Sequence, residues 1–134
     1  MNTKHSLGIS DARIIAAGSR AEAERQGWIV SIAIVDDGGH LLYFERLDAK
    51  ITTIAVATAK ARTAALMRAP SADMARRVKE NPAFLALDAM PLQGGVPILY
   101  QGDCVGGVGV SGVTAEQDEQ VANAGCAALL GSLK

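Results

Sequence analysis

The residues best suited to chemistry gather in the stretch IVDDGGHLLYFERLD, which spans residues 34–48. This stretch contains His40, one of two histidines in the chain, close to Asp36, Asp37 and Arg46. An imidazole titrates near neutral pH, so it can act as a general acid or base, and it is also a good haem ligand. His40 is therefore the first candidate for moving a proton or binding iron.

A purely structural interpretation of the same stretch is equally available from spacing alone. A histidine that follows a Gly-Gly turn is most often a solvated residue at the end of a strand. Arg46 and Asp48 can form a surface ion pair, which contributes little to stability. Local spacing therefore leaves a reactive imidazole and an ordinary hairpin as alternatives.

A second group of candidates interrupts an apolar, alanine-rich segment, AKARTAAL, at Lys60 and Arg62. The long stem of Lys60 can cross apolar surface and place its ammonium group in water. If the ammonium group points into a cavity instead, burial favours the neutral amine, which can act as a base. The sequence leaves both positions of the Lys60 side chain open.

Two further motifs could contact a ligand. Gly94 and Gly95, in LQGGVP, could bring backbone N–H groups towards it, although a Gly-Gly pair before Val-Pro can also be only a turn. Glu116 and Glu119 make an E-x-x-E pair on one helix face, a spacing able to hold iron. Acids in this position are also explained by the positive end of the helix dipole.

Composition excludes several classes of protein. The chain has 134 residues, of which 49% are hydrophobic and 4% aromatic, and its net charge is −1. That charge gives no broad field for nucleic acid or an anionic membrane. No signal-peptide core and no apolar run of about 18 residues is present, so a cytoplasmic protein is expected. Walker, dinucleotide-binding, nucleophile-elbow and HExxH motifs are absent, which disfavours common hydrolases, kinases and dehydrogenases.

The first half of the chain must position His40. Ser10 predicts the start of a helix that runs to about Gln26, with Gly27 as its stop and Ile14, Ile15, Gly18 and Ala21 on one face. WIVSIAIVD and HLLYFERLD read as two strands joined by the turn DDGG. Residues 52–68 favour a helix that lies tight against a sheet. After Pro70, Ser71 predicts a shorter helix to about Glu80, and the irregular stretch 81–95 is of a kind that often lines sites.

The second half repeats the hairpin-and-helix pattern. VPILYQGDCVGGVGVSG, residues 96–112, reads as a hairpin whose second strand is rich in glycine, which indicates close approach of another backbone or helix. Thr114 and Gln117 form a capping box that begins the last helix. Cys104 and Cys126 are isolated and are expected to be buried, reduced thiols.

The predicted order is α-β-β-α-α-β-β-α, and its two hairpins favour an antiparallel sheet. The fold class is therefore α+β, an α/β/α sandwich with a central antiparallel sheet flanked by helices. The whole chain, residues 1–134, is expected to form a single domain, with residues 1–9 as a flexible N-terminal tail.

Four blocks of the sequence together resemble a known family. SIAIVDDGGHLLYFERLD, AKARTAAL, GGVPILYQGDCVGGVGVSG and TAEQDEQVANAG are similar, in order and spacing, to the GlcG/HbpS family of haem-binding or haem-degrading proteins, which includes the PduO C-terminal domains. The resemblance covers residues 10–129. It implies the antiparallel sheet with helices on both sides, and assembly into homo-oligomers from dimers to octamers.

The resemblance implies a small-ligand-binding protein, with haem or another tetrapyrrole as the ligand, or an accessory role in a catabolic pathway. His40 is then the expected haem iron ligand, with Gly94 and Gly95 as further cofactor contacts. A cofactor-independent isomerase, hydratase or lyase is the alternative, with His40 as acid/base, Arg46 or Lys60 holding a carboxylate or enolate, and Glu119 orienting the imidazole. An oligomeric accessory protein without turnover is the third hypothesis.

Overall fold

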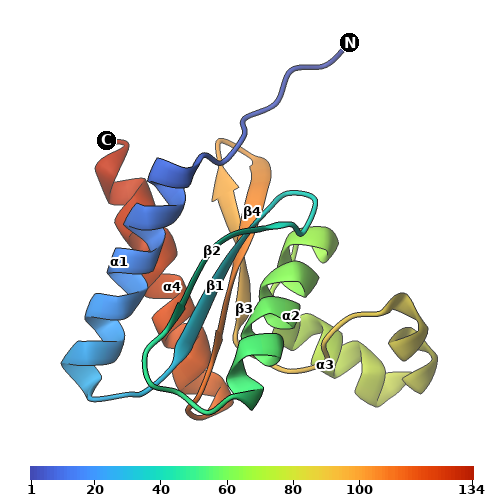
Figure 1. Cartoon of the computed structure of the whole chain (residues 1–134). Coiled ribbons are helices and arrows are strands. Elements are labelled where there is room, and N and C mark those ends of the chain that lie inside the picture. The colour runs from blue at the N-terminus through green and yellow to red at the C-terminus, as the bar shows by residue number, and fades with distance from the viewer.

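A single antiparallel sheet of four strands lies at the centre of the computed structural model, which describes residues 1–134 (Figure 1). The strands are β1 (Ser31–Asp36), β2 (Leu41–Arg46), β3 (Gly95–Tyr100) and β4 (Asp103–Ser111), in the spatial order β2-β1-β4-β3. Both outer pairs are the expected hairpins, and the two hairpins meet where β1 pairs with β4.

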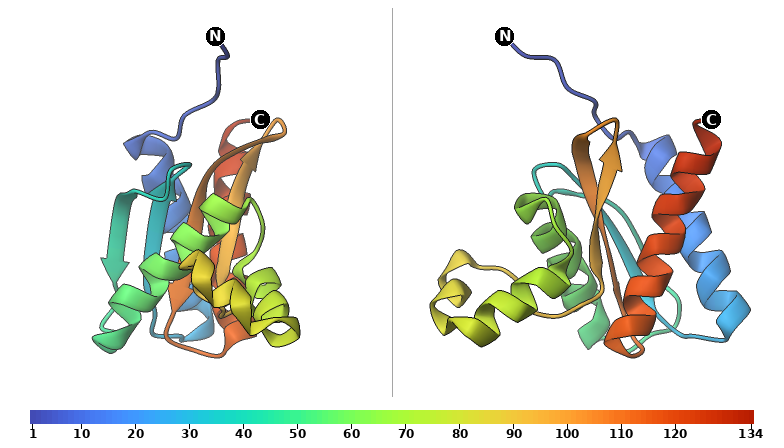
Figure 2. Two further views of the ribbon diagram at one scale, coloured as in Figure 1. Left: turned by 90° about the vertical axis from the view of Figure 1, so that its right-hand side faces the viewer. Right: turned by 180° about the vertical axis from the view of Figure 1, so that it is seen from behind.

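Helices cover both faces of this sheet. On one face α1 (Ile9–Gln26) and α4 (Ala115–Ser132) lie side by side, and on the other lies α2 (Thr52–Met67) (Figures 1 and 2). Beyond α2, the chain continues through α3 (Ser71–Glu80) and the 3-10 helix η1 (Pro82–Leu87). The predicted α/β/α sandwich is confirmed. No helix has the length and apolar character needed to cross a membrane.

Local signals at the helix ends behave as predicted in two places. Gly27 ends α1 in the left-handed region at φ 75°. At the start of α4, the Thr114 hydroxyl accepts a hydrogen bond from the Gln117 N–H, and the Gln117 side chain accepts one from the Thr114 N–H, as a capping box requires.

Two predicted helix starts are wrong by one or two residues. The N-terminal helix begins at Ile9, ahead of Ser10, because the Asp11 carboxylate accepts the N–H of Gly8 at 2.9 Å and caps the helix there. Ser71 lies inside the first turn of α3 and does not cap it. Its hydroxyl is used instead by the loop before β3: it donates to Leu92 O and accepts the Gly95 N–H.

The buried face of α1 also differs from the predicted one. Ile14 and Ala21 are exposed, whereas the buried side chains are Ala12, Ile15, Ala16, Ser19 and Ala23. The reason is the close packing of α1 against α4, where a Cβ at Gly18 would be 3.0 Å from Ala124 O and would overlap further α4 atoms. This contact rotates α1 so that its small residues face α4.

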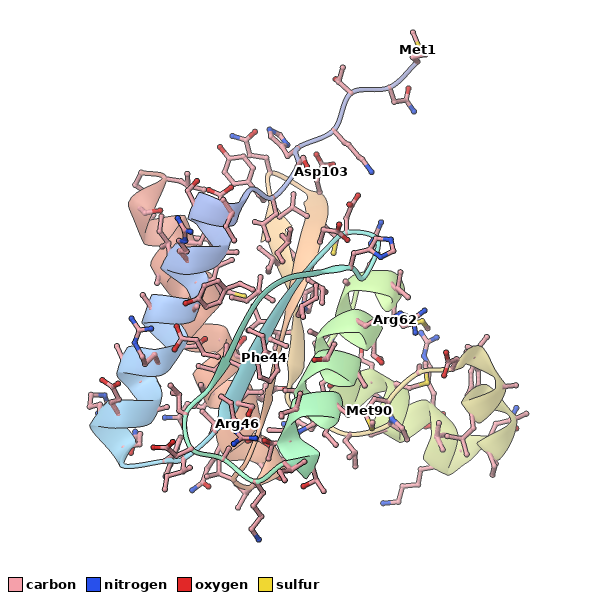
Figure 3. The ribbon with its side chains drawn as sticks, in the orientation of Figure 1. Met1, Phe44, Arg46, Arg62, Met90 and Asp103 are labelled. Carbon is pink, nitrogen blue, oxygen red and sulfur yellow. The ribbon has the colours of Figure 1, made fainter.

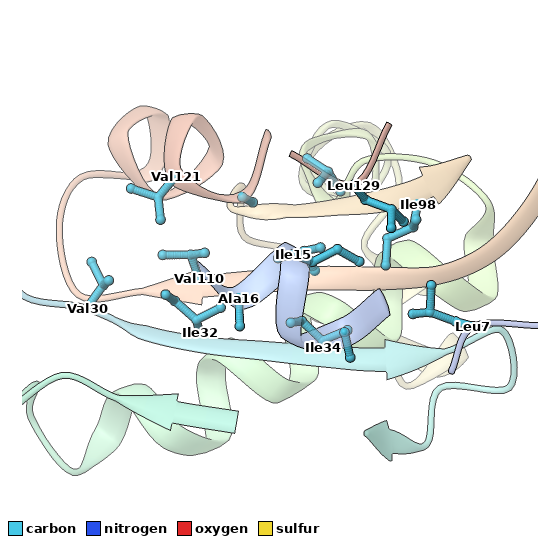
Figure 4. Close-up of a cluster of buried hydrophobic side chains, with 14 of the residues drawn as sticks. Leu7, Ile15, Ala16, Val30, Ile32, Ile34, Ile98, Val110, Val121 and Leu129 are labelled. Carbon is cyan, nitrogen blue, oxygen red and sulfur yellow. The ribbon is translucent and has the colours of Figure 1, made fainter. Parts of the chain in front are cut away.

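The two faces of the sheet have very different cores. Between the sheet and α1 and α4 lie the large aliphatic side chains, which Figure 4 shows interdigitating around Ile15, Ile32, Ile34 and Ile98. Between the sheet and α2 the buried cluster is small, with three alanines of α2 against Ala33 and Val35. The α2 backbone therefore lies much closer to the sheet.

The glycines of β4 make that close approach possible. Side chains alternate along a strand, so Gly107 and Gly109 both face α2. A Cβ at Gly107 would overlap Ala61 O, and one at Gly109 would overlap Ala57 O. The expectation that the glycine-rich strand contacts another backbone is confirmed.

Both cysteines are free thiols and partly buried. Burial raises the pKa of the Cys126 thiol to about 12, which leaves almost no thiolate near pH 8. We expect Cys126 of the native protein to react with iodoacetamide at pH 8 at least about a hundredfold more slowly than in the denatured chain. Mass spectrometry of labelled peptides measures both rates, and equal rates in the two states would contradict the burial of this thiol.

Candidate functional site

His40 lies in a tight turn between β1 and β2 that the Asp36 carboxylate organises. Asp36 Oδ1 accepts the N–H groups of Gly38 and His40, each at 2.9 Å. The turn closes through a backbone hydrogen bond from Asp36 N to His40 O, and Gly39 adopts φ 81°. The backbone around the imidazole is therefore well fixed even though the residue is exposed.

The His40 ring folds back over Gly38. A Cβ at Gly38 would be 3.2 Å from the ring Cδ2 and 3.4 Å from Nε2, so glycine at this position leaves room for the ring. Neither ring nitrogen has a hydrogen-bond or ion-pair partner within the chain. An imidazole without an internal partner is free to bind an external group.

The turn rests on the C-terminal half of α2 through Arg62 and Arg68. A Cβ at Gly39 would be 2.8 Å from Arg62 Cγ, so the arginine stem passes directly beneath the turn. Arg68 donates from NH1 to Asp37 O at 2.8 Å. The turn that carries His40 is consequently placed beside the Arg62 end of α2.

An open groove of about 580 Å³ runs along the outward face of α2, and we call it the α2 groove. It is lined by Ile51, Ile54, Ala55, Thr58, Ala59, Arg62, Thr63 and Asp88. Ile51 is 77% exposed and Ile54 37%, so both present aliphatic surface to the groove. The groove therefore offers an apolar floor with charges at one end.

The far wall of the α2 groove comes from the irregular stretch after η1. Asp88 ends η1 in the left-handed region at φ 53°, and its carboxylate lies 3.4 Å from Arg62 NH1. Two residues on, Met90 N donates to Thr63 Oγ1 at 2.8 Å and ties the stretch to α2 (Figure 3). Of this stretch, only Asp88 lines the α2 groove, and that the stretch belongs to a functional site stays a prediction.

Lys60 points away from the groove, into the protein. Its side chain is 4% exposed, and Nζ donates to Asp118 Oδ2 and to Val110 O, both at 3.0 Å. Asp118 Oδ1 accepts the N–H of Val113. Burial raises the pKa of the Asp118 carboxyl, and the hydrogen bond and charge of Lys60 offset part of that rise. The Lys60 side chain does not extend to solvent; it forms a buried ion pair that joins α2, β4 and α4.

Gly94 and Gly95 belong to the same buried junction. A Cβ at Gly94 would be 2.8 Å from Lys60 Nζ, and Gly94 also adopts φ 131°. The Gly95 N–H already donates to Ser71 Oγ, and a Cβ at this residue would overlap Lys60 O. Both glycines are thus required by packing at the start of β3, and neither lines the α2 groove.

The remaining candidates lie apart from His40. Arg46 is exposed at the far end of β2, six residues or roughly 20 Å of strand from His40, and forms no ion pair with Asp48 (Figure 3). Glu116 is exposed, and Glu119 is half-buried with an unpartnered buried Oε2. No three His, Cys, Asp or Glu side chains are grouped to hold a metal ion.

One end of the sheet thus holds His40, while Lys60 and Glu119 lie at the other, where β4 ends and α4 begins. The four residues expected to cooperate in catalysis do not share a cavity within one chain.

The second histidine lies at the same end of the sheet as His40 but contacts different groups. His5 Nδ1 is 2.9 Å from Asp103 Oδ2, and its ring meets Tyr100 edge-on with centroids 4.8 Å apart. Nearby, Lys4 Nζ is 2.6 Å from Asp37, and Leu7 is buried in the core. The contacts of the N-terminal segment with the rest of the fold therefore begin at Lys4.

Comparison with known proteins gives a family match that spans the β1–β2 hairpin, α2 and most of α4. The family model described as "Haem degrading protein HbpS-like" matches residues 7–127. The chain belongs to the HbpS-like family. Protein GlcG of Escherichia coli K12 is 42% identical to it over an alignment of 114 positions that covers 83% of this chain and 85% of GlcG.

Solved HbpS-like structures share the fold closely. A double mutant of HbpS from Streptomyces reticuli superposes with a TM-score of 0.89 at 33% identity, covering 95% of this chain and 89% of HbpS. A structure described as a PduOC:heme complex superposes with a TM-score of 0.84 at 25% identity, covering 92% of this chain and 95% of PduOC. The predicted family membership is confirmed.

Sequence reasoning missed most of the groove in this HbpS-like chain. Ile51, Ile54 and Thr58 recur at helical spacing with Arg62, which is a signal for one face of α2. That signal was hidden because the alanines of the opposite face are equally apolar. Asp88 carried no signal, since its position depends on how η1 folds back towards α2.

Proposed function

We propose that this protein binds haem, or a closely related tetrapyrrole, in the α2 groove with His40 as the iron ligand. The observation that carries the proposal is the groove itself: about 580 Å³, with an apolar floor and a few polar groups at one end. Ligand pockets typically enclose about 300–1,000 Å³ with mainly apolar lining.

The residues of the groove fit the chemistry of haem. Ile51, Ile54 and Ala55 give an exposed aliphatic surface for a porphyrin face. The turn that carries His40 lies against Arg62 at the charged end of the groove. His40 does not itself line the groove, but its ring nitrogens have no partner within the chain and are available to bind iron. When bound, haem would supply an iron centre for binding small ligands or for electron transfer. What this chain contributes is the apolar surface and a fixed turn that presents the imidazole.

The comparisons support the same ligand class. The matching family model carries haem degradation in its description, and PduOC is described as a complex with haem. An accessory role in a catabolic pathway is compatible with binding alone. The alternative of an enzyme with His40, Arg46, Lys60 and Glu119 receives no comparable support, because Lys60 is buried in an ion pair with Asp118.

Titration with haemin tests the proposal. We expect the wild-type protein to give a saturable Soret band, and His40→Ala to weaken haemin binding by at least about tenfold and to shift the band. The loss would follow from removing the imidazole nitrogen that is proposed to bind iron while the groove stays intact. Absorbance titration measures both the affinity and the band position.

The other histidine provides the matched control. His5→Ala removes an imidazole whose Nδ1 already pairs with Asp103, so its Soret band and affinity should match the wild type. Absence of a Soret band in the wild type would remove haem as the ligand. A spectrum altered by His5→Ala but not by His40→Ala would move the ligand to the N-terminal segment.

We further propose that the protein works as a homo-oligomer. Leu85, Leu87 and Leu92 are each at least 50% exposed on the segment beyond α2. Exposed apolar side chains in such a concentration are typical of a protein–protein interface. Multi-angle light scattering after size exclusion would measure the mass, and a monomeric mass across micromolar concentrations would contradict the proposal.

A further inference from the structure

We infer that Arg62 is the carboxylate-binding residue of the α2 groove. In the free protein its guanidinium pairs with the Asp88 carboxylate, which a ligand carboxylate displaces. The inference rests on the proposed function, since it assigns the group that recognises the acidic edge of the ligand. It makes the groove selective for apolar ligands that carry a carboxylate. Haem is such a ligand, because its two propionates are carboxylates.

Arg62 is the only cationic side chain that lines the groove. Its neighbours along the floor are Ile54, Ala55 and Ala59, which offer nothing to a carboxylate. Asp88 is the only other charged residue of the lining, and it would repel an anion. The hydroxyls of Thr58 and Thr63 also line the groove but carry no charge, so its charge attraction for an acidic ligand must come from Arg62.

The stem of Arg62 is held in place by the turn that carries His40. A Cβ at Gly39 would be 2.8 Å from Arg62 Cγ and 3.5 Å from both Cδ and Nε, so the stem fills the space beneath this glycine. A stem fixed in this way reduces the side-chain entropy that ligand binding would otherwise cost. The same contact links the proposed iron ligand and the proposed carboxylate site.

The guanidinium keeps most of its hydrogen-bonding capacity. Only NH1 has a partner, Asp88 Oδ2, at the long distance of 3.4 Å. The Arg62 side chain is 48% exposed and the Asp88 side chain 93% exposed. An arginine presents five N–H donors in a planar fork that fits a carboxylate with two parallel bonds. A loose, exposed ion pair of this kind contributes little, so a ligand carboxylate can displace Asp88 readily.

Haemin and its dimethyl ester separate this inference from the proposed function, because esterification removes the charges and leaves iron and macrocycle unchanged. We expect the wild type to bind haemin at least about fivefold more tightly than the ester. Arg62→Gln should weaken haemin binding about tenfold and leave the ester unaffected, so that the preference disappears. Arg62→Lys keeps the positive charge but not the forked pair of donors, so its affinity for haemin should fall between those of the wild type and Arg62→Gln.

Asp88→Asn provides the opposite change. It removes the competing carboxylate and should tighten haemin binding by roughly twofold to fivefold, with no effect on the ester. Arg76→Gln is the matched control, because Arg76 forms a similar exposed ion pair with Asp73 on α3, away from the groove. That variant should bind both compounds as the wild type does.

Iron-free protoporphyrin IX extends the test, because it keeps both propionates and needs no axial ligand. Its fluorescence titration should show the same loss in Arg62→Gln. Circular dichroism confirms that each variant is folded.

The outcomes distinguish the two claims. Haemin binding with no preference over the ester, or unchanged in Arg62→Gln, would overturn the role of Arg62 while leaving haem binding in place. A wild-type protein that binds neither haemin nor its ester would overturn both.

Discussion

Gly109→Ala is expected to destabilise the protein by at least about 3 kcal/mol and to lower its melting temperature by roughly 10 °C. Gly109 lies on the face of β4 that α2 covers, and a Cβ there would overlap Ala57 O and come within 3.0 Å of Ala61 Cα. The obstacle is helix backbone, which cannot rotate away as a side chain can. Accommodating one methyl group requires α2 to move off the sheet. Urea unfolding followed by circular dichroism measures the change.

Gly131→Ala is the matched control for this prediction. Gly131 lies near the end of α4, and a Cβ there has no atom within 4 Å. Alanine is the better helix former, so this variant should be as stable as the wild type or more stable by up to about 1 kcal/mol. If both glycine variants unfolded at the wild-type urea concentration, the close contact between α2 and β4 would be wrong.

Lys60→Met is the second large prediction, with an expected loss of about 3–5 kcal/mol in the free energy of unfolding. Methionine fills a similar volume but leaves the Asp118 carboxylate buried, 3% exposed, without its counter-ion. Val110 O also loses its side-chain donor. Lys79→Met, which removes an exposed lysine of α3, should change stability by no more than about 0.5 kcal/mol.

A double variant isolates the ion pair from the effect of truncation. Asp118→Asn removes the charge and keeps an oxygen able to accept the Val113 N–H. Lys60→Met combined with Asp118→Asn should therefore be less destabilised than the sum of the two single changes, by at least about 1 kcal/mol. Additive single effects would show that Lys60 and Asp118 do not interact in the folded protein.

The pH dependence of the stability of Lys60→Met follows from the Asp118 carboxyl. Burial already raises the pKa of Asp118 above its usual value of 3.8, and loss of Lys60 removes an interaction that lowers it. A carboxyl whose pKa is raised on folding favours the folded state below its unfolded pKa, and this contribution is lost as pH rises through the folded pKa. The stability deficit of Lys60→Met should therefore shrink as the pH is lowered from 7 towards 4. A deficit that grows over this range would contradict the assignment.

Much of the fold could be predicted because its signals are local. The left-handed glycine after α1, the Asp-Gly-Gly turn before His40 and the Thr114 capping box each act through hydrogen bonds within four residues. Two hairpins joined by helical segments then leave an antiparallel sheet as the simplest arrangement. The family resemblance, carried by four ordered blocks, agreed with that fold and with the matching family model.

The arrangement of the candidate site could not be predicted in the same way. Alanines surround Lys60 and Arg62 on every side of α2, so no contrast between apolar and polar faces indicated which of the two points inward. Ser71 has the type of residue expected at a helix start, yet its hydroxyl joins the loop before β3. In both cases the deciding partner lies more than 20 residues away along the chain.

By itself, the sequence determined the four α-helices, the strands, their order and the family, because each depends on neighbours along the chain or on a whole-chain pattern; the 3-10 helix η1 was not predicted. Only the tertiary structure decided that Lys60 pairs with Asp118 in the interior while Arg62 lies at the mouth of the α2 groove. The reason is the close packing permitted by Gly107 and Gly109, which sets how α2 is rotated against the sheet. That rotation sends one cation inward to a carboxylate and leaves the other beside His40.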